Sequence, residues 1–390
     1  MSDMKFCGKP GEVAFAKGLE NVIIGESKKS YVDGDKGVLL YEGIRIEELA
    51  EKSSFEEVSY LLLYDRLPTH RELADFKEKL SLWREIPDDV YECISRHAKN
   101  PSVHTMSVLR TAVSLLGMHD EDSEDSSFDA NERKAIKLIS RIATIVAAIG
   151  RIRKGLQPIK PKYDTTHAGN FYWMLHGKDP DAESEKVLDV LSILHIDHEC
   201  NASTFTSVTT ISSLTDIYSA VVAAIGSLKG PLHGGANEQV VKTLRDIGKP
   251  ENAEKYIQNA LKRKEKIMGF GHRVYKSYDP RAAILKKYGE KLVKRAGLEG
   301  WLEIAKIIEK YMIEKLGQKG IYPNVDFYSG IVMHSLGIET YLFTPMFALG
   351  RISGWVAHIL EQLKDNRIFR PRFWYIGPLE ASYISIEARE

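Results

Sequence analysis

Apolar residues recur at helical spacing along most of this chain, and that periodicity restricts the fold to a mainly helical one. One long predicted helix carries its apolar face on Ile136, Ile139, Ile142, Ala143 and Val146. Residues three or four positions apart lie on the same side of an α-helix, so such a face packs against a core. A second stripe of this spacing runs through 55–62, and the proline-rich stretch 155–161 ends the long helix.

Sheet signals are confined to the first part of the sequence. The short apolar pieces Val22-Ile-Ile24 and Gly37-Val-Leu-Leu-Tyr41 flank the turn residues Asp33-Gly-Asp-Lys36, which predicts a small hairpin. The sequence therefore predicts an all-α fold with a minor N-terminal β-hairpin.

Length and charge narrow the range of partners. The 390 residues are 43% hydrophobic, which is enough for a large core and a division into two domains. The 54 Lys and Arg residues balance the 54 Asp and Glu residues, so no overall field attracts nucleic acid or an acidic membrane. We expect neither as a partner, and an anionic ligand would have to meet a local positive cluster.

Cysteine usage and hydropathy indicate the compartment. Cys7, Cys93 and Cys200 are far apart and form no CxxC pair, which favours a reducing environment over a disulfide framework. The sequence begins without an apolar run of signal-peptide length, and none of its later runs reaches the ~18–20 apolar residues of a membrane span. We expect a cytoplasmic protein.

The stretch 195–204 contains the first candidate site residues. His195, His198 and Glu199 would share one face if this segment were helical, and His and Glu are good zinc ligands. The spacing matches neither HExxH nor HxxEH and a third ligand is missing, so no metal site is predicted. His195 is interpreted as a histidine satisfied by neighbouring helices, an interpretation that fits His198 less well.

The stretch GPLHGGANE surrounds His233 with glycines. Glycines at 230, 234 and 235 allow positive φ angles and a close approach of the backbone to a ligand. A helix is predicted to begin at 236, and its first N–H groups favour an anion or a developing oxyanion. The alternative is a corner between two helices in which His233 only hydrogen-bonds the backbone.

Two further stretches combine glycine or aromatic residues with ionisable groups. In 262–281, Gly269 and Gly271 lie within a basic cluster that suits a phosphate- or carboxylate-bearing small molecule. A solvated basic face is the alternative for the lysines, and it fits His272 and Arg281 less well. GxxxxGK[ST] and GxGxxG are both absent, which argues against a nucleotide-binding fold.

The last stretch, 321–330, sets Asp326 among aromatic residues. Apolar surroundings raise the pKa of a carboxyl group and make it a better base. The alternative is that Asp326 is the N-cap of the following helix. Two histidines on flexible turns, this carboxylate and several arginines together suit proton abstraction next to a carbonyl, with an anionic partner held by guanidinium groups.

At these residues the chain resembles the citrate synthase family, from about residue 17 to residue 372. The resemblance rests on GPLHGGANE, GFGHRVYKSYDPRA, PNVDFYSG and the predicted helix around Arg351. It implies a helical homodimer with a large domain, 1–234 and 336–390, and a small domain, 235–335. It also implies that oxaloacetate binding closes the domains and forms the acetyl-CoA site.

The resemblance also implies a role for each site residue. Asp326 would take a proton from the acetyl methyl group while His233 donates a hydrogen bond to the thioester oxygen. His272 would polarise the oxaloacetate ketone, and the citryl-CoA thioester would then be hydrolysed. The residues that hold oxaloacetate or citrate would be His198, Arg281, Arg351 and Arg370, the last reaching the neighbouring subunit's site.

Acetyl-CoA is implied as a co-substrate, with no permanently bound cofactor. The residues that would line the adenine of CoA are Lys266, Met268, Gly269, Phe270 and Gly271. Lys276 stands where some relatives have an arginine for a CoA phosphate. The segment His-Glu-Cys-Asn-Ala-Ser departs from the HEVPAST form of some relatives, which leaves the role of Cys200 open.

Three other functions compete with this interpretation. 2-Methylcitrate synthase uses propionyl-CoA and shares the catalytic set, and one methylene changes discrimination by only about 1–3 kcal/mol. A non-catalytic CoA- or carboxylate-binding protein would have lost one of His233, His272 and Asp326. A metal-dependent hydrolase would use His195, His198 and Glu199.

Overall fold

The structure is a computed structural model that describes residues 16–20, 22–373 and 375–389. Contacts divide these into a main unit, Ser27–Arg367, and a smaller unit made of the described residues up to Glu26 and from Ile368 onward. The smaller unit contains two short 3-10 helices, η1 (Lys17–Leu19) and η4 (Ile386–Ala388).

The main unit is built almost entirely from helices, which confirms the predicted fold class. Within its described residues the α-helices are α1 (Ile46–Lys52), α2 (Phe55–Tyr64), α3 (His70–Leu82), α4 (Asp88–Ala98), α5 (Thr105–Met118), α6 (Phe128–Arg153), α7 (His167–His176), α8 (Ala182–His195), α9 (Ala202–Ile211), α10 (Ile217–Leu228), α11 (Ala236–Ile247), α12 (Pro250–Lys262), α13 (Pro280–Arg295), α14 (Glu299–Leu316), α15 (Val325–Ser335) and α16 (Phe343–Lys364). Two 3-10 helices, η2 (Gly317–Lys319) and η3 (Thr340–Leu342), precede α15 and α16.

The small sheet differs from the predicted hairpin in its first strand. It has three antiparallel strands in the order β1 (Ser30–Asp33), β2 (Val38–Tyr41) and β3 (Ile44–Arg45). The prediction placed the first strand at 22–24, which is wrong. Asp33 pairs directly with Val38 across the turn, so the residues immediately before the turn must form the partner strand. Ile23 is instead 90% exposed.

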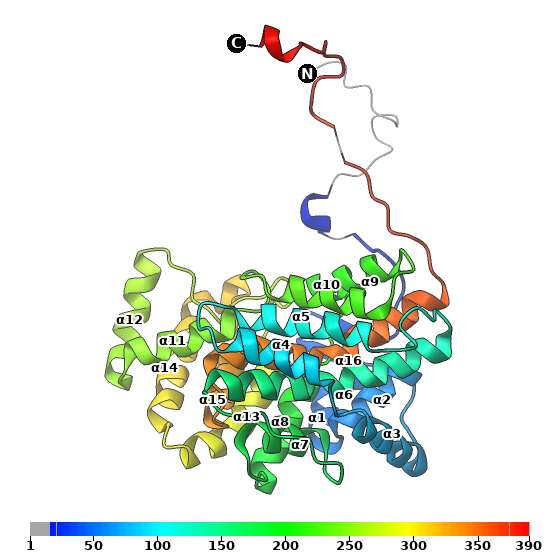
Figure 1. Cartoon of the computed structure of the whole chain (residues 1–390). Helices are drawn as coiled ribbons and strands as arrows, with labels where there is room; N and C mark the ends of the chain where they lie inside the picture. Colours follow the sequence, from blue (N-terminus) through cyan, green and yellow to red (C-terminus); the bar gives the residue numbers. More distant parts are fainter. Residues whose placement is uncertain (1–15, 21, 374, 390) are drawn as a thin grey trace. The chain divides into compact units, whose positions relative to one another are not determined.

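Helix α16 lies at the centre of the main unit and packs against α2, α6, α8, α9 and α10 (Figure 1). Its residues from Phe343 to Leu360 are buried. Gly350 and Gly354 let its backbone approach the end of α8, because a Cβ at Gly354 would lie 2.1 Å from the Ile196 carbonyl oxygen. This close contact brings the buried side chains of α16 next to the 196–201 segment.

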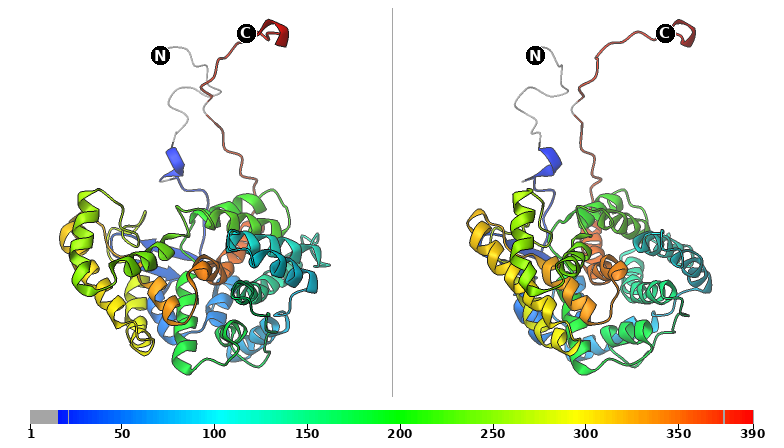
Figure 2. Two further views of the ribbon diagram at one scale, coloured as in Figure 1. Left: turned by 60° about the vertical axis from the view of Figure 1, so that its left-hand side comes forward. Right: turned by 90° about the vertical axis from the view of Figure 1, so that its left-hand side faces the viewer.

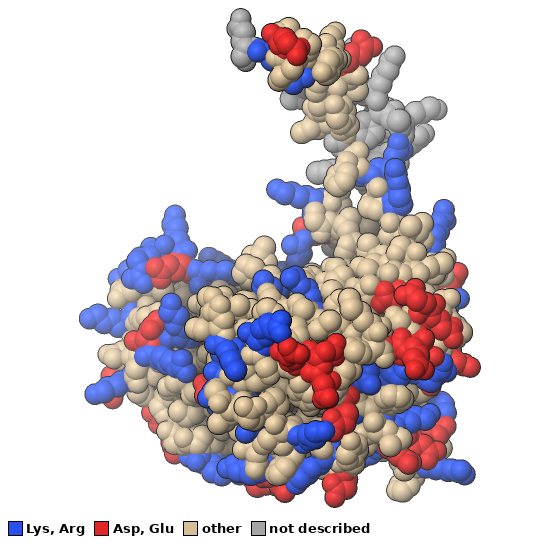
Figure 3. Space-filling view, in the orientation of Figure 1, with Lys and Arg blue, Asp and Glu red and all other residues tan. Residues whose placement is uncertain are grey.

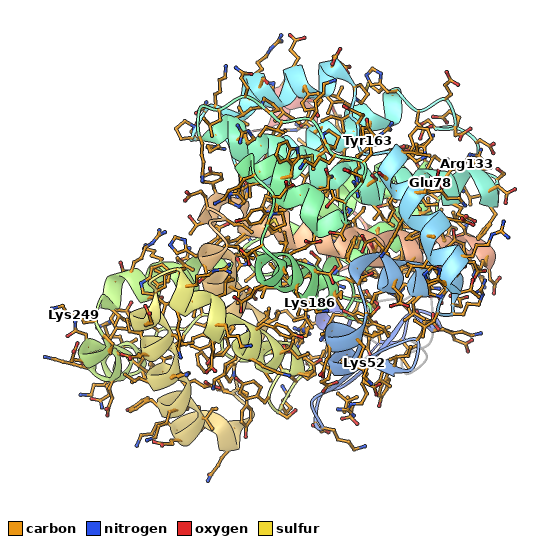
Figure 4. The ribbon with its side chains drawn as sticks, turned by 90° about the horizontal axis from the view of Figure 1, so that it is seen from below. Lys52, Glu78, Arg133, Tyr163, Lys186 and Lys249 are labelled. Atoms are coloured by element: carbon orange, nitrogen blue, oxygen red, sulfur yellow. The ribbon has the colours of Figure 1, made fainter. Side chains whose placement is uncertain are left out.

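Helices α11 to α15 pack mainly on one another and form one side of the main unit (Figure 2). Viewed from below, Lys249 lies at the outer edge of this group, while Glu78 and Tyr163 lie together on the other side (Figure 4). The span of α11 to α15 falls within the expected small domain, 235–335, and the division into large and small domains stays a prediction. Among the described helices none is long and apolar enough to cross a membrane.

Candidate active site

The GPLHGGANE loop joins α10 to α11 and fixes the tautomer of His233. The His233 Nε2 accepts a hydrogen bond from the Ser203 backbone N–H (3.2 Å) and lies 2.9 Å from the Ser203 hydroxyl. A backbone N–H can only donate, so in the neutral ring the proton resides on Nδ1. Burial, helped by the charge of Arg351, lowers the pKa of His233 to about 4. His233 is therefore a neutral ring with an Nδ1–H donor.

The glycines of this loop serve close packing. Gly230, Gly234 and Gly235 all have negative φ angles, so the expected use of positive φ is wrong here. A Cβ at Gly234 would lie 2.4 Å from the Leu228 carbonyl oxygen, which only glycine avoids. The Thr344 hydroxyl of α16 donates to the Gly234 carbonyl (2.9 Å). The alternative in which His233 only hydrogen-bonds the backbone at a corner between two helices is confirmed for Nε2, which accepts from the Ser203 N–H. The Nδ1–H remains a donor.

The loop between α12 and α13 fixes His272 in the opposite tautomer. Its Nδ1 accepts from the backbone N–H groups of Val274 (3.0 Å) and Tyr275 (3.2 Å), so the neutral ring carries its proton on Nε2. Burial lowers the pKa of His272 to about 4, and the positive charges of Arg281 and Lys276 contribute. Here the glycines do have positive φ angles, +80° at Gly269 and +79° at Gly271.

Asp326 lies in the first turn of α15 and is not its N-cap. Asn324 caps the helix, because its side-chain oxygen accepts from the Asp326 N–H (3.0 Å). The Asn324 amide nitrogen donates to the Gly271 carbonyl (2.9 Å), which ties the His272 loop to the start of α15. Burial raises the pKa of Asp326 to about 6, although Arg281 acts in the other direction. The described residues give the Asp326 carboxylate no hydrogen bond, so it is available as a base.

Asp279 connects two helix starts and orients Arg281. Its carboxylate caps α13 and accepts from Nε (3.0 Å) and Nη2 (2.8 Å) of Arg281. It also accepts from the Val325 N–H (3.1 Å) at the start of α15. Arg281 is only 2% exposed, and this pairing does not use its Nη1 group. A fixed guanidinium with free N–H groups suits a carboxylate ligand.

Arg351 and His198 are buried with unpaired nitrogen atoms. Arg351 is 1% exposed and donates from Nε to the His195 carbonyl (2.7 Å), whereas its Nη1 has no partner in the described part of the chain. Burial lowers its pKa to about 10, with Asp197 opposing the shift. The Nε2 of His198 is also unpaired among the described residues, and burial together with Arg281 lowers its pKa well below 6.5. An anionic ligand would satisfy such groups.

Ring contacts place His272 next to His198, one of the residues expected to bind the dicarboxylate. The His198 and His272 ring centroids are 5.0 Å apart, and both rings contact Tyr275. On the other side, the Phe347 ring lies 4.9 Å from the Arg351 guanidinium carbon and 6.4 Å from the His233 ring centroid. The Arg281 guanidinium carbon lies 6.0 Å from the centroid of the same Tyr275 ring, which places Arg281 with His198 and His272, and Arg351 is bonded to His195, three residues before His198. Arg370 belongs to the smaller unit, and its role stays a prediction.

The residues expected to line CoA lie on the irregular segment between α12 and α13. Lys266 and Lys276 are exposed, and Met268 is half-buried. Phe270 is buried against Phe327, with ring centroids 4.6 Å apart, so this residue offers its backbone more than its side chain. In Figure 3, Lys and Arg side chains are frequent on the left of the molecule, where Figure 1 places α11, α12 and α14, with a few acidic side chains among them. For the lysines, a solvated basic face remains the alternative.

The geometry of 195–201 does not support the zinc arrangement. Helix α8 ends at His195, and Glu199 has a left-handed φ of +49° and turns to β1, where its Oε1 accepts from the Val32 N–H (2.7 Å). The three side chains therefore do not share a helical face. Within the described ranges no cluster of three or more His, Cys, Asp or Glu side chains is arranged to hold a metal ion.

Cys200 follows Glu199 in the same segment. Cys200 is exposed, and partial desolvation together with the negative charges of Asp197 and Glu199 raises the pKa of its thiol. The thiol stays protonated at neutral pH and is a weak nucleophile.

Sequence reasoning did not find the residues that hold the site together. Ser203 sets the tautomer of His233, Asp279 orients Arg281, and Asn324 caps the helix that carries Asp326. The Pro323-Asn324 pair before the helix was a usable N-cap signal, as was Asp279-Pro280. The contact of Ser203 with His233 spans 30 residues and had no local signal.

Comparison with known proteins identifies relatives over nearly the whole chain. The model of the family "Citrate synthase, C-terminal domain" matches residues 18–372. Citrate synthase of Deinococcus radiodurans is 48% identical over 96% of this chain and 99% of its own. The crystal structure of citrate synthase from Pyrobaculum aerophilum is 44% identical, with a TM-score of 0.90 over 96% of this chain and 95% of that one. 2-Methylcitrate synthase of Shewanella oneidensis is 39% identical over 95% of this chain and 97% of its own.

Proposed function

The chain belongs to the citrate synthase family and is an acyltransferase of that family, and we propose that it condenses acetyl-CoA with oxaloacetate and hydrolyses the resulting citryl-CoA. The observation that carries the proposal is the pair of opposite, fixed tautomers, together with a carboxylate that accepts no hydrogen bond from the described residues. His233 offers Nδ1–H, His272 offers Nε2–H, and Asp326 offers a carboxylate of raised pKa. This set matches what enolisation and attack on a ketone require.

In the first step Asp326 takes a proton from the acetyl methyl group. The C–H bond is weakly acidic, so negative charge must be stabilised on the thioester oxygen as it develops. The Nδ1–H of His233 donates to that oxygen. Because the ring is neutral, it stabilises the enol or enolate by hydrogen bonding and need not transfer its proton.

In the second step the enol carbon attacks the ketone of oxaloacetate. The Nε2–H of His272 polarises the ketone oxygen and then protonates the alkoxide that forms. Two backbone N–H groups at Nδ1 stabilise the ring as it gives up this proton. Water then hydrolyses the citryl-CoA thioester to citrate and CoA.

His198, Arg281 and Arg351 hold the dicarboxylate in this proposal. Their buried nitrogen atoms are oriented before the ligand binds, which lowers the cost of binding. Arg370 completes the site from a neighbouring subunit of a homodimer. Closure of the 235–335 domain excludes water during condensation. The segment from Lys266 to Gly271 lines the adenine of CoA, and Lys276 meets a CoA phosphate.

The experiment that tests this function follows release of the CoA thiol from acetyl-CoA and from propionyl-CoA. We expect release that depends on oxaloacetate and a strong preference for acetyl-CoA, and activity that persists in a chelator. Comparable or faster release from propionyl-CoA would favour 2-methylcitrate synthesis. No release with either thioester would favour a non-catalytic binding protein.

The rate should fall at acid pH because Asp326 must be ionised to act as the base. Its pKa is raised to about 6, so the base is present above that pH and is lost as the pH falls through it. We expect kcat/KM for acetyl-CoA to fall about tenfold per pH unit below pH 6. His233 and His272, each with a pKa of about 4, remain neutral across this limb. A rate that is level between pH 7 and pH 5 would contradict the assignment.

A further inference from the structure

A buried ion pair between Asp197 and His358 lies next to the residues assigned to the dicarboxylate, and it has no part in the reaction steps proposed above. Asp197, which is fully buried, lies 2.9 Å from the Nε2 of His358, which is 7% exposed. The same carboxylate oxygen accepts from the Ser30 hydroxyl (2.5 Å). Burial alone would lower the pKa of His358, but the charges of Asp197 and Glu361 outweigh it and raise the pKa to about 9. A carboxylate faces each ring nitrogen, Asp197 at Nε2 and Glu361 at Nδ1 (3.6 Å), so His358 is a cation that donates to Asp197.

This pair belongs to a hydrogen-bonded group around His198, here called the clamp, which consists of Ser30, Tyr41, Asp197, Glu199 and His358. On one side of His198, the Tyr41 hydroxyl accepts from the Asp197 N–H (3.1 Å) and lies 2.9 Å from the Asp197 carbonyl oxygen. On the other side, the Glu199 N–H donates to the Ser30 hydroxyl (2.8 Å). The residues before and after His198 are thus both bonded to the small sheet, and Asp197 is also bonded to α16.

One face of α16 reaches both the clamp and the candidate anion site. Arg351, Gly354 and His358 are three and four residues apart, so they lie on one side of the helix. Arg351 donates to the His195 carbonyl, Gly354 packs on the Ile196 carbonyl, and His358 pairs with Asp197. Three successive residues at the end of α8 are therefore bound by three residues of one helix face.

We propose that His358 is a positioning residue for the dicarboxylate substrate, holding Asp197 so that His198 and Arg351 keep their orientation. The proposal rests on the proposed function, because it assigns His198 and Arg351 to that substrate. The charge of His358 is essential to it. The Asp197 Oδ1 and the Arg351 Nη1 are both buried without a partner among the described residues, and Asp197 Oδ1 lies against the α16 face that carries Arg351, because a Cβ at Gly354 would be 3.1 Å from it. Without the imidazolium, the Asp197 carboxylate would therefore draw Arg351 toward itself.

The test is a steady-state analysis of His358→Gln, which keeps an N–H donor and removes the charge. We expect the KM for oxaloacetate to rise about three- to tenfold, as when a hydrogen bond between two charged groups is replaced by one from a neutral donor. The KM for acetyl-CoA and kcat should stay within about twofold of the wild-type values, since neither His233 nor Asp326, the residues assigned to acetyl-CoA, is hydrogen-bonded to a residue of the clamp. His167→Gln, a buried histidine of α7, is the matched control and should leave both KM values unchanged.

Ser30→Ala supplies a second variant that does not depend on replacing a core residue. Ser30 is only half-buried and bonds both Asp197 and Glu199, so its loss should raise the KM for oxaloacetate about three- to tenfold. If His358→Gln does not fold, Ser30→Ala decides the question.

An unchanged KM for oxaloacetate in the folded variants, or an equal rise of both KM values, would overturn the role of His358. Failure of the wild-type protein to release CoA with oxaloacetate would instead overturn the proposed function.

Discussion

Asp326→Asn is expected to lower kcat about a thousandfold, within the range over which a positioned general base contributes. The amide has the size of the carboxylate and keeps the start of α15 intact, because Asn324 and not Asp326 caps the helix. It has no basic oxygen to take a methyl proton. Oxaloacetate binding, measured by calorimetry, should change less than threefold, because Arg281 is held by Asp279.

Asp246→Asn is the matched control for this variant. Asp246 is an exposed aspartate of α11, so the change of charge is the same and the site is untouched. Its kcat should equal that of the wild-type protein. A kcat of Asp326→Asn within about tenfold of the wild-type value would exclude Asp326 as the base, since a positioned base contributes more than that.

His233→Ala is expected to lower kcat about a hundred- to a thousandfold, the range seen when one donor to a developing oxyanion is removed. The side chain contributes one fixed Nδ1–H, whose direction is set by the Ser203 N–H at the other nitrogen. The loss should fall on kcat, because the charge on the thioester oxygen develops only in the transition state. Ser203→Ala keeps that N–H and should lower kcat less than about tenfold, because it removes only the neutral hydrogen bonds of the hydroxyl with His233, Asn201 and Trp355.

Nitrogen NMR of the two histidines provides a separate check on this prediction. His233 should show the Nδ1–H tautomer and His272 the Nε2–H tautomer, both neutral at pH 7. An Nε2–H proton on His233 would contradict the proposed donor, whatever the kinetics of the variants.

Local patterns in the sequence predicted helices and pointed to candidate site residues, whose roles stay a prediction. Apolar spacing gave α2 and α6, and the glycine- and aromatic-rich stretches gave His233, His272 and Asp326. These signals are local because a helix face and a turn each involve residues close in the chain. The same reasoning misplaced β1. It took the apolar tripeptide 22–24 as the first strand, although the residues that pair across the turn are those immediately before it.

The supporting contacts were beyond local patterns because they join distant parts of the chain. Ser30 and Asp197 are 167 residues apart, and His358 and Asp197 are 161 residues apart. No helical or turn spacing relates such positions. The tautomers of His233 and His272 also depend on which N–H groups the folded backbone presents, and these appear only in three dimensions.

The most direct test of the proposed mechanism is the release of tritium from methyl-labelled acetyl-CoA into water. With oxaloacetate present, the wild-type protein should release label and CoA thiol in step, because each condensation removes one methyl proton. Asp326→Asn should slow both about a thousandfold. Release of label by Asp326→Asn at the wild-type rate would show that another group takes the proton, and would contradict the assignment of Asp326 as the base.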